Sequence, residues 1–265
     1  AARYLPSGAL DTTFDGDGLV TIVFQTAPDL SGGVGEVLLQ PDGRLVLVGW
    51  FADSPVLRYA LARLNADGSL DPSFGTGGKV TTPLAGGVGA GLAAVLQPDG
   101  RIVVLGSTGA ASAPVVALAR YNADGSLDPA FGAGGQVSVP LAGPFRPHAL
   151  ALQADGKILI AGASGPSGGP FDFGVIRLLP GGGLDTSFDG DGLATSDFGG
   201  TENAFSALVL GDGRIVLAGY RTSPATDFAL VRYLSDGSLD TTFGTGGLAA
   251  ADSGASEIAD GVIVQ

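Results

Sequence analysis

One short motif occurs five times in this chain and constrains its fold more than any other feature. The motif is a glycine, one further residue, Leu-Asp, two further residues and a phenylalanine, followed by a glycine-rich tail. A fixed period of this size is typical of repeat architectures, in which one supersecondary unit is multiplied. The fold is therefore best derived from a single repeat. The motif aspartates are Asp11, Asp71, Asp128, Asp185 and Asp240, spaced 60, 57, 57 and 55 residues apart.

Each repeat contains four short apolar segments. In one copy the first segment ends at a Pro-Asp-Gly turn at 41–43, and the others lie at 45–49, 60–65 and 79–82. Asp-Gly between two apolar runs predicts a β-hairpin, because glycine readily adopts the positive φ of such a turn. Segments of about 4–7 residues bounded by glycine predict strands rather than helices. Four antiparallel strands per repeat predict an all-β propeller blade; a parallel β-helix is the rival, but its coils are shorter and lack tight hairpins.

The repeating unit resembles the bacterial delta-60 repeat family. The resemblance rests on the Asp-Gly-Arg turn, the Arg-Tyr-Asn strand end and the Asp-Gly-Ser-Leu-Asp loop, and it covers essentially all 265 residues. It implies a β-propeller of undetermined function, usually in secreted or envelope-associated bacterial proteins. It carries no catalytic residues to transfer to this chain.

We expect a single propeller domain over residues 1–265, with about five repeats of four-stranded antiparallel blades. The ends of the chain match two parts of one repeat, because 258–265 resembles a first strand and 1–4 the end of a third. Either the ends share a blade that closes a five-bladed ring, or the chain is a segment of a longer array; we favour the segment. The predicted blades are 34–90, 91–147, 148–203 and 204–257, with a split blade from 258–265 plus 1–33.

Composition excludes several functions and suggests a location. The chain has no cysteine, which excludes disulfides, zinc–thiolate sites and cysteine nucleophiles. No apolar run reaches the length of a membrane span. A net charge of −13, with basic residues distributed by the repeat, argues against nucleic acid as a partner. Charged residues are only 15% of the chain, which suits an extracellular or cell-envelope bacterial protein.

An arginine precedes every motif aspartate by eight residues. A guanidinium can hold a carboxylate through two parallel hydrogen bonds, so we predict structural Arg–Asp clamps that fix the motif loop. A ring of ligand-binding arginines is the alternative. We expect the motif leucine and phenylalanine to fold over the blade edge and pack there. The predicted clamps are Arg3–Asp11, Arg63–Asp71, Arg120–Asp128, Arg177–Asp185 and Arg232–Asp240.

Two copies carry Asp-Gly-Asp-Gly, at 15–18 and 189–192, where the others have a tail of small residues. Calcium prefers hard oxygen ligands, and a further aspartate precedes each of these tails. The pattern falls short of a complete calcium loop, and turn-forming aspartates explain it equally well. The candidate calcium ligands are Asp11, Asp15, Asp17, Asp185, Asp189 and Asp191.

Blade topology separates uniform loops from divergent ones. The first-to-second and third-to-fourth loops share one face and are nearly identical among copies. The second-to-third loops and the blade connections share the other face, which we call the variable-loop face. These divergent segments are 51–58, 107–115, 163–171 and 220–226, with connections at 26–33, 140–148 and 197–204. The single histidine, His148, ends one connection, and the single tryptophan, Trp50, ends a second strand.

A rigid scaffold with divergent loops on one face is how recognition surfaces are commonly built. We therefore expect a non-catalytic binding or scaffold module whose partner, a protein or a glycan, docks on the variable-loop face. One alternative is a structural subunit of a surface assembly, joined through the strand edges of incomplete blades. The other is a propeller hydrolase or lyase acting at the central channel.

Overall fold

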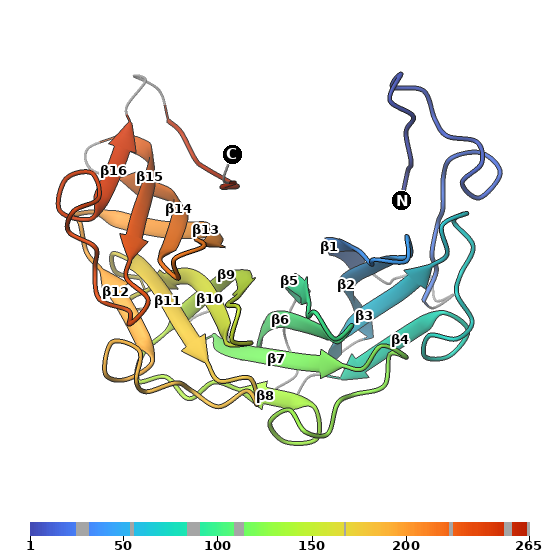
Figure 1. The fold of residues 1–265 in the computed structure, drawn as a ribbon, viewed down its shortest axis with the longest axis horizontal. Coiled ribbons are helices and arrows are strands. Elements are labelled where there is room, and N and C mark those ends of the chain that lie inside the picture. Colours follow the sequence, from blue (N-terminus) through green and yellow to red (C-terminus); the bar gives the residue numbers. More distant parts are fainter. Residues whose placement is uncertain are drawn as a thin grey trace.

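The protein consists of β-strands joined by tight turns. The computed structural model describes residues 1–24, 32–53, 56–83, 91–108, 114–166, 168–222, 225–251 and 256–263. Within these residues there is no helix, and the strands form four separate antiparallel sheets of four strands each (Figure 1). The predicted all-β class and four-stranded blades are therefore confirmed.

Within each sheet the strands follow one another in sequence order. The first blade contains β1 (Gly32–Leu39), β2 (Leu45–Asp53), β3 (Val56–Leu64) and β4 (Lys79–Pro83). The second contains β5 (Gly91–Leu96), β6 (Ile102–Thr108), β7 (Val115–Tyr121) and β8 (Gln136–Ser138). The third contains β9 (Phe145–Leu152), β10 (Ile158–Ser164), β11 (Asp172–Leu178) and β12 (Leu193–Ser196). The fourth contains β13 (Thr201–Val209), β14 (Ile215–Thr222), β15 (Thr226–Tyr233) and β16 (Leu248–Ala251).

A β-bulge in the first two strands of each blade explains several of the glycines. The register shifts between Val34 and Glu36 in the first blade and between Ala204 and Ser206 in the fourth. A Cβ atom on Gly219 would lie 1.8 Å from the carbonyl oxygen of Asn203 on the facing strand. Glycine is therefore required for the close approach of the two backbones. Bulges increase the local twist of a strand, and here they lie in the pair formed by the first two strands of each blade.

The hydrophobic core lies between blades rather than inside one sheet. Val48 and Leu61 of the first blade pack against Ile102 and Val104 of the second, and all four side chains are fully or almost fully buried. Equivalent clusters fill the spaces between the second and third blades and between the third and fourth. The central strands are therefore buried on both faces, which explains their continuous apolar runs.

The four blades lie side by side in an arc that is not closed (Figure 1). The inner strands β1, β5, β9 and β13 pack against one another in that order. Residues 1–24 lie beside the first blade, and 256–263 lie beside the fourth, across the opening (Figure 1). Residues 258–263 form no strand, contrary to the expectation for 258–265, and Ala259 instead donates its N–H to the carbonyl of Gly219. Residues 264 and 265 lie outside the described part of the chain.

The described residues therefore show an open arc of blades and not the five-bladed ring that was one of the two predicted readings. They also contain no helix of the length and hydropathy that a membrane span requires.

Candidate functional site

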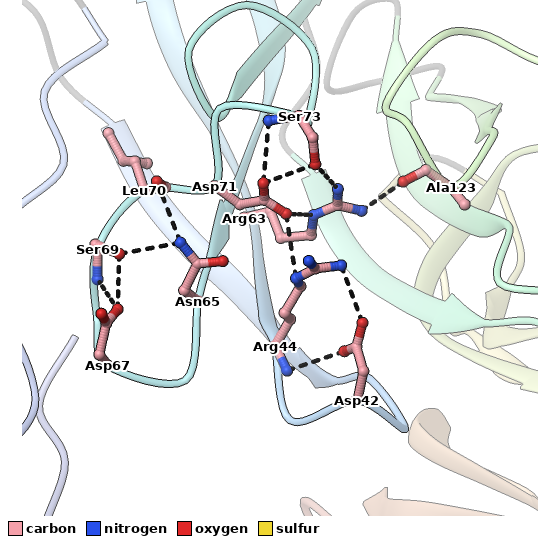
Figure 2. A network of polar contacts seen from close by, with 10 residues as sticks. All are labelled: Asp42, Arg44, Arg63, Asn65, Asp67, Ser69, Leu70, Asp71, Ser73 and Ala123. Carbon is pink, nitrogen blue, oxygen red and sulfur yellow. Dashed lines mark hydrogen bonds and ion pairs between the residues drawn. The ribbon is translucent and has the colours of Figure 1, made fainter.

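The structure pairs every clamp arginine with its motif aspartate. In all five copies the arginine Nε donates to the aspartate Oδ2 at 2.7 to 2.8 Å. The predicted two parallel bonds to one carboxylate are not seen; in four of the copies Nη1 donates to a backbone carbonyl instead. Figure 2 shows this in the first blade, where Arg63 binds Asp71 through Nε and the hydroxyl of Ser73 through Nη2.

A second cation reaches the same carboxylate in each blade. Arg44, from the hairpin turn between β1 and β2, lies with its Nε 3.3 Å from Oδ2 of Asp71 (Figure 2). Arg101, Lys157 and Arg214 occupy the equivalent place in the other blades. Hydrogen bonds from Ser73 and the charge of Arg63 hold the pKa of Asp71 below its ordinary value, although burial opposes them. The aspartate therefore joins two loops of one blade as an ionised group.

The remaining guanidinium nitrogen, Nη1, reaches the next repeat. Arg120 donates from Nη1 to the carbonyl oxygen of Pro180, and Gly132, the residue after the motif phenylalanine, donates its N–H to the carbonyl of Gly181 at 2.9 Å. Gly182 completes that turn, and a Cβ atom on it would lie 3.0 Å from the ring of Phe131. The guanidinium of Arg120 also lies over this ring, 4.5 Å from its centroid.

We call this set of contacts the blade junction. Its donor half is the clamp arginine, the motif phenylalanine and the N–H after that phenylalanine. Its acceptor half is the three-residue turn ending in glycine. Four junctions occur in the described residues, with acceptor halves at 66–68, 123–125, 180–182 and 235–237. The clamp thus connects blades as well as loops, which a reading of one repeat does not predict.

Four of the six candidate calcium aspartates have side-chain hydrogen-bond partners in the structure, and the other two lie in left-handed turns. Asp15 and Asp189 adopt φ angles of 53° and 50°, the left-handed conformation typical of turn residues. Asp17 and Asp191 each accept a hydrogen bond from the backbone N–H two residues later. The carboxylates of Asp11 and Asp185 bind Arg3 and Arg177. These contacts fit the turn alternative, and calcium at these loops stays a prediction.

A different group of carboxylates gathers on the variable-loop face. Asp172 begins β11, Asp197 follows β12, and Glu202 lies near the start of β13. One carboxylate oxygen of each lies within 4.8 Å of the others. Oxygen ligands at such separations are what a hard divalent cation uses. Asp197 is exposed, so the group can be reached from solvent.

Glu202 is the unusual member of this group. Its side chain is fully buried, and its Oε1 has no hydrogen-bond partner among the described residues. Its Oε2 accepts a long bond of 3.5 Å from the N–H of Phe198. Burial raises the pKa of Glu202 to about 7, with further contributions from the charges of Asp197 and Asp172. A buried carboxyl group with a free oxygen calls for a proton or a cation there.

Sequence reasoning missed this group because its members lie outside the repeated motif. Asp172 stands five residues before the clamp arginine, where the other blades have Arg58, Val115 and Asp227. The signal available in the sequence was the variation among blades at such equivalent positions. Only the contact between the third and fourth blades shows that the three carboxylates meet.

Two other predicted features can be placed. His148 lies on β9 in contact with the fourth blade, where its Nε2 is 3.2 Å from Nδ2 of Asn203 and its ring meets Phe205 edge-on. The His148 side chain is half-buried at this contact. Trp50 lies near the end of β2, opposite Gly33 of β1, where a Cβ atom on Gly33 would lie 3.3 Å from the indole Nε1. The divergent segments 26–33, 51–58, 107–115, 163–171 and 220–226 each fall partly outside the described residues.

A chain of four-stranded blades fastened by repeated junctions is a β-propeller repeat protein. A family model described as "Domain of unknown function (DUF5122) beta-propeller" matches residues 40–74, 97–131, 153–188 and 210–243, which together exceed half of the chain. The chain belongs to this family. Each match runs from a hairpin turn to a motif phenylalanine. The expected β-propeller repeat of undetermined function is therefore confirmed, although the match does not carry the delta-60 name.

Among solved structures, the chain is similar to one described as "Structure of a new family of Polysaccharide lyase PL25-Ulvanlyase". The identity is 12% and the TM-score 0.37, over 77% of this chain and 53% of that one. The chain thus spans about half the length of that structure. So distant a likeness carries no argument about activity. Comparison with curated proteins gives no match.

Proposed function

We propose that this chain is a non-catalytic binding module whose partner, a protein or a glycan, docks on the variable-loop face. The other loop face is occupied by the module's own structure, because its arginines, aspartates and phenylalanines bind one another in every blade. The variable-loop face instead carries charged groups that are not repeated. The observation that carries the proposal is the fully buried Glu202, whose free oxygen meets two further carboxylates.

This acidic group suits a divalent cation, and we propose calcium held by Asp172, Asp197 and Glu202. The three residues come from β11, from the connection after β12 and from β13, so one cation would join the third and fourth blades at the docking face. Because its pKa is raised to about 7, the carboxyl group of Glu202 is partly protonated near neutral pH, and calcium binding would displace that proton. An extracellular or envelope location remains part of the proposal, since calcium sites of modest affinity are common outside cells.

A thermal melt with calcium and with a chelator tests the cation. At a calcium concentration 100 times the Kd, the stabilisation would be about 2.7 kcal/mol, or a rise in Tm of about 5–10 °C. Asp197→Asn should abolish the rise, and Asp191→Asn should preserve it. The reverse result would place calcium in the Asp-Gly-Asp-Gly loop. A wild-type Tm that does not change with calcium would refute the proposed calcium binding.

Docking itself is tested with a panel of bacterial surface glycans on the immobilised chain. We expect binding that Asp197→Asn weakens and that Asp99→Asn, in a hairpin turn on the opposite face, leaves unchanged. Binding that responds only to Asp99→Asn would refute docking on the variable-loop face. The propeller-enzyme alternative gains no support from the distant lyase structure.

A further inference from the structure

Two arginines outside the repeated positions lie beside the acidic group of Asp172, Asp197 and Glu202. The first, Arg146, is near the start of β9 and exposed, and its guanidinium lies over the ring of Phe171, 4.1 Å from the centroid. Phe171 directly precedes Asp172, and its carbonyl accepts a hydrogen bond of 2.6 Å from the N–H of Glu202. The buried ring of Phe171 therefore holds a cation next to the backbone that carries the acidic group.

Arg146 has no acidic partner within the described part of the chain. The clamp and hairpin cations each bind an aspartate, whereas the guanidinium of Arg146 contacts an aromatic ring. A guanidinium stacked on an aromatic face keeps its N–H donors in its own plane, pointing away from the ring. Because Arg146 is exposed, these donors can bind a carboxylate that arrives from solvent.

The second arginine, Arg221, lies on β14. It is opposite Glu202 on β13 and opposite Asp227 on β15, so the three charged side chains form one row across the fourth blade. Nε of Arg221, Oε1 of Glu202 and Oδ1 of Asp227 are buried, and none has a hydrogen-bond partner among the described residues. The region thus sets four carboxylates against two guanidinium groups. A divalent cation at the acidic group cancels the excess negative charge, which would otherwise repel an anionic ligand.

The acidic group does not fill the coordination of calcium by itself. Calcium binds about six to eight oxygen atoms, and three carboxylates supply at most six. Oε2 of Glu202 also accepts the long bond from the N–H of Phe198, which reduces that supply. A calcium ion held here would keep open positions on the side of the exposed Asp197, where oxygen atoms of a ligand can bind.

We propose that the docking site recognises an acidic glycan, and that the carboxylate of a uronate residue bridges the bound calcium and the guanidinium of Arg146. This inference rests on the proposed function, because it requires calcium at the acidic group. A uronate suits the site better than an acidic peptide side chain, since its ring oxygen and hydroxyl groups lie beside the carboxylate and can occupy further calcium positions. The whole chain carries a net charge of −13, so binding of a polyanion depends on these cations.

The test is isothermal titration calorimetry with trigalacturonate and with its methyl ester, in calcium and in chelator. We expect the free acid to bind in calcium and the uncharged ester to bind at least about tenfold more weakly. Chelation should abolish binding of the acid. Arg146→Gln should weaken binding of the acid by about tenfold or more and leave the rise in Tm with calcium unchanged. The matched control is Arg58→Gln, near the start of β3 on the same face of the first blade, which should bind the acid as the wild type does.

The outcomes separate the acidic glycan from the proposed function. A wild-type Tm that does not change with calcium would refute the calcium site and the acidic glycan together. If the Tm does rise, equal binding of the acid and the ester, or equal binding by Arg146→Gln and the wild type, would overturn the acidic glycan alone. Absence of trigalacturonate binding, or binding that persists in chelator, would also overturn it. Binding of a hexa-aspartate peptide in place of trigalacturonate would overturn it in favour of a protein partner.

Discussion

Arg120→Ala is the most informative single substitution, because Arg120 contacts the buried Asp128 and Phe131 and also the carbonyl of Pro180 in the next repeat. Its side chain is 8% exposed and that of Asp128 is 4% exposed. The change leaves Asp128 with Arg101 alone as a cationic partner, at 3.2 Å. It also leaves the carbonyl of Pro180 without a donor and removes the cation from above Phe131.

The magnitude follows from these contacts. Breaking a buried ion pair from one side costs about 3–5 kcal/mol, and the remaining Arg101 reduces that figure. The lost bond to Pro180 adds about 1 kcal/mol, and the cation–π contact adds about 0.5–1 kcal/mol. We expect a loss of about 3–4 kcal/mol in the free energy of unfolding. For a chain of this size, that lowers Tm by about 10 °C.

Arg232→Ala is the matched control. This substitution removes the same bond to an aspartate, from a side chain that is more exposed, at 17%. Among the described residues, no carbonyl of a following repeat loses a donor. We expect a loss smaller by about 1–2 kcal/mol, the part due to the contact between blades. Urea denaturation of both variants gives the comparison. Equal losses would refute the contribution between blades, and an unchanged Arg120→Ala protein would refute the clamp itself.

Two further predictions concern stability. The pKa values of Asp71, Asp128 and Asp240 are held below 3.8 in the folded protein, where hydrogen bonds and arginine charges outweigh the opposing effect of burial. The unfolded chain therefore binds more protons, so the stabilisation is present above pH 3.8 and is lost as pH falls through the folded values; urea midpoints that stay constant from pH 5 to pH 3 would contradict this. Gly219→Ala places a Cβ atom against the carbonyl of Asn203 and should cost about 1–3 kcal/mol in urea denaturation. Gly211→Ala, where the added atom meets nothing within 4 Å, should cost far less, and equal costs would show that the bulge does not need glycine.

The sequence by itself determined the repeat, the strands and the clamp pairs. Hairpins at Asp-Gly turns and Arg–Asp pairs eight residues apart depend on contacts within one repeat, so local spacing is enough to predict them. The pairing of Arg63 with Asp71 is such a case. The prediction of two parallel bonds in each clamp was wrong. In four copies the Nη1 atom of the arginine has its acceptor in the next repeat, and no spacing within one unit indicates that acceptor.

Tertiary structure alone decided how the repeats combine. The acidic group of Asp172, Asp197 and Glu202 exists because the third blade packs on the fourth, and the pKa of Glu202 depends on the burial that this packing creates. Repeats specify their internal contacts in the sequence, whereas contacts between non-repeated side chains depend on the relative placement of blades, which the sequence pattern does not encode.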